Sequence, residues 1–143
     1  MCKNFDGREI HLLFDTYRED SLKLNERRRR GEADCDYLIA TPEQNPKQPF
    51  EKLLKSSKFK QALTKFLQDE WQKEHYYPCF QGKIVYVSIG GSCIQITPQE
   101  NRVEVTWPTT LQGEHEEADT LLAFHAKQVF IYSCILVALI LLG

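Results

Sequence analysis

The sequence predicts an α/β fold in which a mostly parallel central sheet is surrounded by helices. Three apolar segments supply the predicted strands: residues 10–14, 83–89 and 129–142. Amphipathic segments between them predict the helices that pack around the sheet. With 143 residues, 42% hydrophobic and 27% charged, the composition is that of a single globular domain.

The first predicted strand, residues 10–14, follows a start over residues 1–9 that has no packing pattern and is expected to be unstructured. The strand ends at Asp15, so its carboxyl end presents an acid. Open α/β sheets place their sites at such strand ends. Residues 16–31 are polar and basic, with a helix start predicted at Asp20.

The middle of the chain predicts a loop and then a helix. Three prolines within residues 41–49 indicate a loop. Apolar residues then recur at helical spacing and predict an amphipathic helix over residues 57–73, whose apolar stripe faces the core. Pro78 and Gly82 break this pattern before the next strand.

The second predicted strand, residues 83–89, is followed by Gly90 and Gly91, which form its exit turn. Two glycines are too few for a phosphate-binding loop of the Walker or dinucleotide type. Alternating residues over 93–97 and 102–107 predict a β-hairpin. A helix is expected over residues 119–128, with acids at its start, where the helix dipole favours negative charge.

The last predicted strand, residues 129–142, has a rival interpretation as a membrane segment. Its fourteen apolar residues would span roughly 21 Å as a helix, which is short of a hydrocarbon core of roughly 30 Å. The β-branched and aromatic residues at its start suit a buried parallel strand. A strand is favoured, and a membrane anchor formed by residues 129–143 remains the alternative.

Charge and cysteine content limit the classes of function. The chain has 18 basic and 20 acidic residues, so any attraction to nucleic acid must come from a local patch. Its five cysteines are scattered without zinc-ligand spacing, which is typical of reduced thiols in an intracellular protein. No signal peptide is apparent at the start, so the nucleus or cytoplasm is expected, with the membrane as the alternative.

Three acids are the candidate metal ligands: Asp15 at a strand end, and Glu117 and Asp119 at a helix start. Carboxylates that converge from separate elements hold Mg²⁺ or Mn²⁺, because a cation is needed between like charges. The other interpretation of Glu117 and Asp119 is that they only complement the positive end of the helix dipole.

These residues also carry a resemblance to a family. Phe14 and Asp15, then Lys23, then the arginines at 27, 28 and 30, resemble the strand acid and basic residues of flap-endonuclease-like members of the PIN-like nuclease superfamily. Residues 117–119, Glu-Ala-Asp, are similar to the superfamily's Glu-Ala-Glu metal motif at a helix start. From about His11 to Gly143, the chain most closely resembles a group of animal proteins found in repetitive or transposon-like copies.

The resemblance implies a three-layer PIN/flap-endonuclease-like domain and a two-metal phosphodiesterase, with the cations held by Asp15, Glu117 and Asp119. It implies that four basic side chains hold nucleic-acid phosphates without sequence readout. They are Lys23, Arg27, Arg28 and Arg30. The alternative for the arginines is a solvated helix end with cations at the negative end of the dipole.

The chain departs from the family pattern in two places. The superfamily's first metal aspartate lies on a strand well upstream of the one that ends at Asp15, and its Asp-x-Asp strand end falls at Ile135 and Val137. We therefore expect a degenerate or truncated nuclease-like domain, incomplete at both ends, that binds metal weakly and is inactive. The alternative is an interaction protein with a C-terminal membrane anchor.

Overall fold

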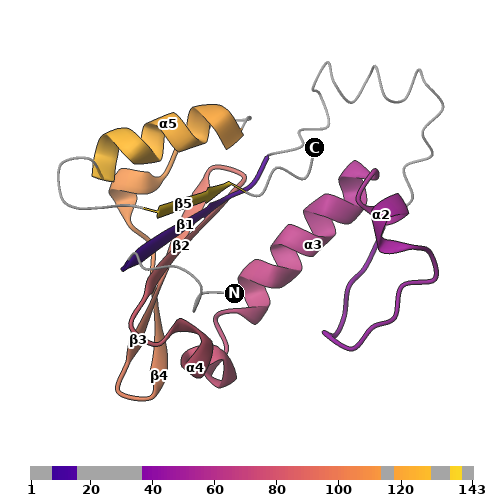
Figure 1. The fold of residues 1–143 in the computed structure, drawn as a ribbon, viewed down its shortest axis with the longest axis horizontal. Helices are drawn as coiled ribbons and strands as arrows, with labels where there is room; N and C mark the ends of the chain where they lie inside the picture. Colours follow the sequence, from indigo (N-terminus) through magenta and orange to yellow (C-terminus); the bar gives the residue numbers. More distant parts are fainter. Residues whose placement is uncertain (1–7, 16–36, 114–117, 130–135, 140–143) are drawn as a thin grey trace.

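The computed structural model describes residues 8–15, 37–113, 118–129 and 136–139, and shows an α/β fold with one mixed sheet (Figure 1). The sheet has five strands in the order β4-β3-β2-β1-β5. The strands are β1 (Glu9–Leu13), β2 (Ile84–Ile89), β3 (Ser92–Gln99), β4 (Arg102–Thr106) and β5 (Leu136–Leu139).

The strand β1 lies between β2 and β5 and is parallel to both. The other two pairings, β2 with β3 and β3 with β4, are antiparallel. The prediction of a mostly parallel sheet is therefore wrong: the three predicted strands pair in parallel, but half of the pairings in the sheet are antiparallel. The difference arises because the hairpin predicted at residues 93–107 joins the same sheet and adds two antiparallel strands to it.

Two tight turns build the antiparallel half. Gly90 and Gly91 connect β2 to β3 with φ of 60° and 86°, and Glu100 and Asn101 connect β3 to β4 with φ of 44° and 66°. Two-residue loops with positive φ at both positions match the twist of paired strands. The glycines meet this requirement without strain, whereas Glu100 must adopt a conformation that costs an ordinary L-residue free energy. The predicted exit turn and hairpin are both confirmed.

The helical elements are α2 (Phe50–Leu53), α3 (Ser57–Glu70), η2 (Glu74–Tyr76), α4 (Tyr77–Phe80), η3 (Thr109–Leu111) and α5 (Ala118–Val129). The helix α3 begins where the Ser56 side chain accepts a hydrogen bond of 3.3 Å from the Phe59 amide. It ends at Glu70, earlier than the predicted residue 73. Pro78 does not break helical structure, because it lies in the first turn of α4, where no amide hydrogen bond is lost.

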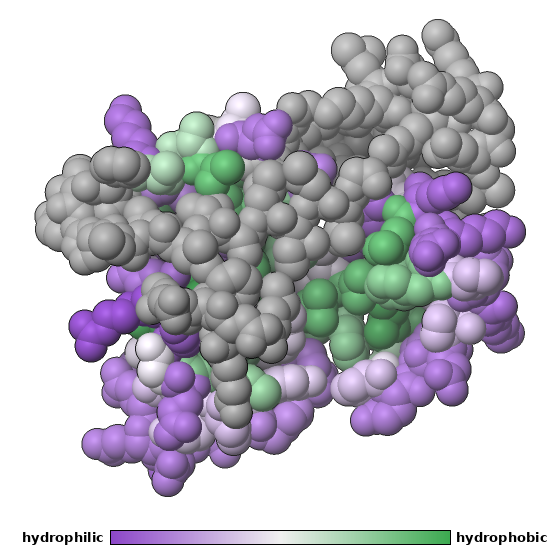
Figure 2. Space-filling view, in the orientation of Figure 1, coloured by the Kyte–Doolittle hydropathy of each residue, from purple (hydrophilic) through white to green (hydrophobic). Residues whose placement is uncertain are grey.

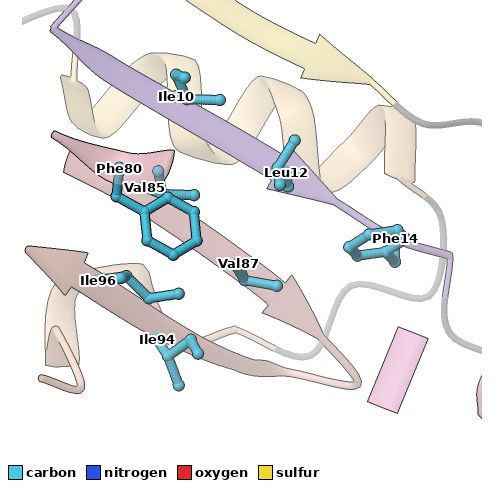
Figure 3. Packing of buried hydrophobic residues seen from close by; sticks show 8 residues of the cluster. All are labelled: Ile10, Leu12, Phe14, Phe80, Val85, Val87, Ile94 and Ile96. Carbon is cyan, nitrogen blue, oxygen red and sulfur yellow. The ribbon is translucent and has the colours of Figure 1, made fainter. Parts of the chain in front are cut away.

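The main core lies on the face of the sheet opposite α5 (Figure 3). Alternate residues of the three inner strands point into it, because side chains of a strand alternate between faces. The cluster consists of Ile10, Leu12, Phe14, Phe80, Val85, Val87, Ile94 and Ile96. Burial of each such side chain contributes about 1.5–3 kcal/mol. Phe80 of α4 and the partly buried Trp71 and Tyr76 cover this face.

Two further predicted boundaries are corrected, and one predicted loop is confirmed. The unstructured start does not extend to residue 9, because β1 begins at Glu9 and the Ile84 amide donates to the Arg8 carbonyl at 2.8 Å. The last strand does not begin at Val129, which ends α5, and β5 occupies only Leu136–Leu139 of the described residues. Residues 41–49 contain neither helix nor strand, as predicted.

Candidate functional site

Asp15 and Asp119 lie at the same edge of the sheet. Asp15 follows the carboxyl end of β1, and Asp119 is in the first turn of α5. The helix α5 contacts both β1 and β5. It precedes β5, which is parallel to β1, so α5 runs antiparallel to both strands. Figure 1 shows the start of α5 at the edge where β1 ends.

The contact between His11 and His125 provides a common level from which the positions of Asp15 along the strand and Asp119 along the helix can be measured. The two rings touch, with their Nδ1 atoms 2.9 Å apart. Asp15 is four residues beyond His11, or about 13 Å along an extended strand. Asp119 is six residues before His125, or about 9 Å along a helix. Both displacements run toward the same edge, so both acids lie toward that edge, at levels that differ by about 4 Å.

The remaining predicted site residues lie outside the described part of the chain. They are Glu117, Lys23, Arg27, Arg28 and Arg30. Of the two acids described, Asp15 is half-buried and Asp119 is exposed. Among the described residues, no three His, Cys, Asp or Glu side chains are grouped closely enough to hold a metal ion.

The sheet register changes the expectation for Val137. Val137 pairs with His11, and Leu139 pairs with Leu13. Val137 is therefore level with the middle of β1, four positions before Asp15. An acid at Val137 would not lie at the edge that carries Asp15, and Ile135 lies outside the described residues. The family pattern leads us to expect that Ile135 and Val137 occupy the positions of two acids at the edge that carries Asp15. This expectation is wrong for Val137.

A buried polar cluster, which we call the histidine cluster, lies between α5 and the sheet. It consists of His11 on β1, Ser88 on β2 and His125 on α5, all at most 2% exposed. His125 contacts His11 through Nδ1, and its Nε2 lies 3.0 Å from the Ser88 hydroxyl oxygen. The His11 ring stacks on Tyr86, with centroids 4.3 Å apart and planes 16° from parallel.

The proton positions in the histidine cluster follow from its neighbours. One Nδ1 must carry a hydrogen and the other must accept it. The Glu9 carboxylate lies 3.9 Å from His11 Nε2, an atom that has no hydrogen-bond partner among the described residues. A nearby anion favours a hydrogen on that nitrogen. His11 Nδ1 is then the acceptor, His125 Nδ1 donates to it, and the Ser88 hydroxyl donates to His125 Nε2.

Burial sets the ionisation of this region. The pKa of His11 is lowered from 6.5 to about 4, first because burial disfavours its charged form and then because His125 is close. Cys93, which pairs with Ser88 across β2 and β3, is fully buried. Burial raises the pKa of its thiol to about 11, and a side-chain hydrogen bond between Cys93 and Ser88 lowers it by a smaller amount. Both groups are therefore neutral near pH 7.

The order Ser88, His125, His11 resembles a nucleophile with its base and a residue that orients the base. Ser88 is only 2% exposed, however, so its hydroxyl is not accessible to a substrate in this structure. The chemistry that the arrangement supports is structural: it fixes the rotation and height of α5 on the sheet. Sequence reasoning did not identify it, because each member is an isolated polar residue in an otherwise apolar pattern.

Comparisons with known proteins assign no family to this chain. No family model matches it, and neither the curated proteins nor the solved structures contain a match. Across the described residues, no helix combines the length and the apolar character needed to cross a bilayer.

Proposed function

We propose that this chain is a three-layer PIN/flap-endonuclease-like domain that binds a divalent cation weakly and does not hydrolyse nucleic acid. The observation that supports it best is the position of Asp15 at the end of β1, at the same edge as the first turn of α5 with Asp119. Acids at that edge are the arrangement expected of a site for Mg²⁺ or Mn²⁺.

The proposed cation site has too few acids for catalysis. Asp15 and Asp119, with Glu117 as the third ligand, supply at most three carboxylates. Two-metal hydrolysis requires enough negative charge to hold both cations against their mutual repulsion. Ile135 and Val137 contribute no charge. One weakly held cation is the consequence, without activation of a water for in-line attack.

The test of the cation site is a Mn²⁺ titration monitored by thermal unfolding. A ligand that binds only the folded protein stabilises it, by about 1.4 kcal/mol at tenfold its dissociation constant. Asp15→Asn and Asp119→Asn should each reduce the Mn²⁺-dependent rise in melting temperature. Asp69→Asn is the matched control, because Asp69 is an exposed acid on α3.

Two outcomes would reject the cation site. One is a wild-type protein whose melting temperature does not change with Mn²⁺. The other is a Mn²⁺ response that Asp15→Asn leaves intact. Hydrolysis of flap, single-stranded or RNA substrates by the unmodified chain would reject the proposed inactivity.

Nucleic-acid binding is the second part of the proposal, and it rests on Lys23, Arg27, Arg28 and Arg30. If these cations hold phosphates, the affinity for branched or single-stranded DNA falls steeply with salt, because bound counterions are released. Replacing the three arginines with alanine should abolish binding. Affinity that is independent of salt, or unchanged in the alanine variant, would favour a solvated helix end instead.

The alternative function, an interaction protein with a membrane anchor at residues 129–143, has less support. The pairing of Leu136–Leu139 with β1 favours a strand for that part of the segment. Recovery of the full chain in the membrane fraction after washing with high salt and carbonate would favour the anchor.

A further inference from the structure

A pocket lies between α3 and the extended segment formed by residues 37–49, on the opposite side of the fold from α5. Its volume is about 370 Å³. Gln44 holds the segment in shape, since its Oε1 accepts from the Ala40 amide at 2.9 Å and its Nε2 donates to the Leu38 carbonyl at 3.0 Å. Figure 2 shows apolar surface hollowed between hydrophilic rims in this region.

Aromatic rings form much of the pocket wall. Tyr37 and Phe59 are 4.9 Å apart between ring centroids, with their planes at 86°. Phe50 and Phe59 are 5.8 Å apart, with their planes at 84°. All three aromatic side chains line the pocket, and in each pair the ring planes are nearly perpendicular. The faces of such rings carry negative charge density and attract organic cations.

Among the described residues, one acidic side chain lines the pocket, and it is buried. Glu70 lies at the end of α3, and its side chain is only 7% exposed. Its Oε2 is paired with Lys73. Its Oε1 lies 3.8 Å from His75 Nε2, which is beyond hydrogen-bond distance. Lys73 and His75 are 56% and 61% exposed, so both partners extend toward solvent.

We propose that this pocket binds a small organic amine whose body is aromatic or aliphatic and whose ammonium group approaches Glu70. The volume is within the range of small-molecule sites, which bury an apolar ligand and orient it with a few polar groups. The side chain of Gln44 is already hydrogen-bonded to backbone atoms of its own segment. Glu70 is the charged residue among the described ones that line the pocket, and its carboxylate selects the ligand. An anion of the same shape is disfavoured by the same carboxylate.

The probes are 2-phenylethylamine, 2-phenylethanol and 3-phenylpropionate, which have a similar body and carry positive, zero and negative charge. Binding to the full chain is measured by NMR titration of the α3 amides. The amine should bind about tenfold more tightly than the alcohol, the size expected for a hydrogen bond to a charged group. The carboxylate should bind more weakly than either.

Glu70→Gln should remove the preference for the amine while retaining binding of the alcohol. Glu74→Gln is the matched control, because Glu74 is an exposed acid on η2 that does not line the pocket, and it should leave the preference intact. Ile39→Trp places bulk in the pocket from the 37–49 segment and should abolish binding of amine and alcohol alike.

Several results would overturn the proposal: no binding of the amine at millimolar concentration, equal affinity for amine and alcohol, or binding that survives in Ile39→Trp. If Glu70→Gln does not fold, the relative affinities of the three probes and the loss of binding in Ile39→Trp still test the proposal. The pocket does not depend on the cation site, so Mn²⁺ binding and amine binding can fail separately.

Discussion

The Nδ1 atoms of His11 and His125 lie 2.9 Å apart, inside the protein and 114 positions apart in the chain. Two imidazoles at this distance share one hydrogen, since two lone pairs or two N–H groups facing each other would repel. Adding a second proton would place positive charge in a buried site beside another ring. The contact therefore holds α5 on the sheet only while His11 is neutral.

The pH dependence of stability tests this contact. The pKa of His11 is lowered to about 4 in the folded protein, against 6.5 for an unperturbed histidine. The unfolded chain therefore binds more protons between these values, and the free energy of unfolding falls as the pH drops from 6.5 to 4. The loss attributable to His11 is at most about 3 kcal/mol. It is measured by urea unfolding at a series of pH values.

Carboxylates also titrate near pH 4, so variants must separate the histidine contribution. His11→Leu should be less stable than wild type at pH 7 and should show a flatter pH dependence between 6.5 and 4. His75→Gln is the matched control, because His75 is 61% exposed and lies outside the histidine cluster. An unchanged slope in His11→Leu would contradict the role given to His11.

The reactivity of two cysteines provides a second prediction. Cys93 is fully buried and its pKa is raised to about 11, whereas Cys79 is exposed. Thiolates, rather than thiols, are the nucleophiles toward alkylating reagents. We expect iodoacetamide at pH 8 to modify Cys79 rapidly and Cys93 only after unfolding. Peptide mapping by mass spectrometry after timed quenching measures both; rapid native modification of Cys93 would show that this region opens.

The register of β5 provides a third prediction. Because Val137 pairs with His11, Val137→Asp adds a carboxylate about 13 Å from the level of Asp15. The variant should lose stability and should not gain affinity for Mn²⁺. Thermal unfolding with and without Mn²⁺ measures both effects. A clear gain in Mn²⁺ affinity would indicate that β5 is shifted toward the family register.

Elements with strong local signals were predictable from the sequence. The strands β1 and β2, the β3-β4 hairpin, and the helices α3 and α5 are confirmed with small shifts of their ends. Periodicity does not report which strands pair, so the mixed sheet was not predicted. The short helix α4 was missed because Pro78 was interpreted as a break, although proline is tolerated in a first helical turn.

The candidate sites likewise differ in whether a local signal in the sequence marks them. Asp15 was identifiable because an acid directly follows an apolar strand. The histidine cluster was not, because His11, Ser88 and His125 become neighbours only after the sheet and α5 have formed. The pocket was also missed: the apolar stripe of α3 was interpreted as core in preference to a binding surface, whereas Leu63, Phe66 and Leu67 also line the pocket.

The position of β1 between two partners from later in the chain has a consequence for synthesis on the ribosome. Its hydrogen-bonding groups are satisfied by residues 84–88 and 136–139, so both edges stay open until those residues have left the exit tunnel. Pairings that close such long loops form slowly. An apolar strand whose edges are unpaired during synthesis can aggregate. A chaperone that shields residues 9–13 during translation would therefore raise the yield of folded protein.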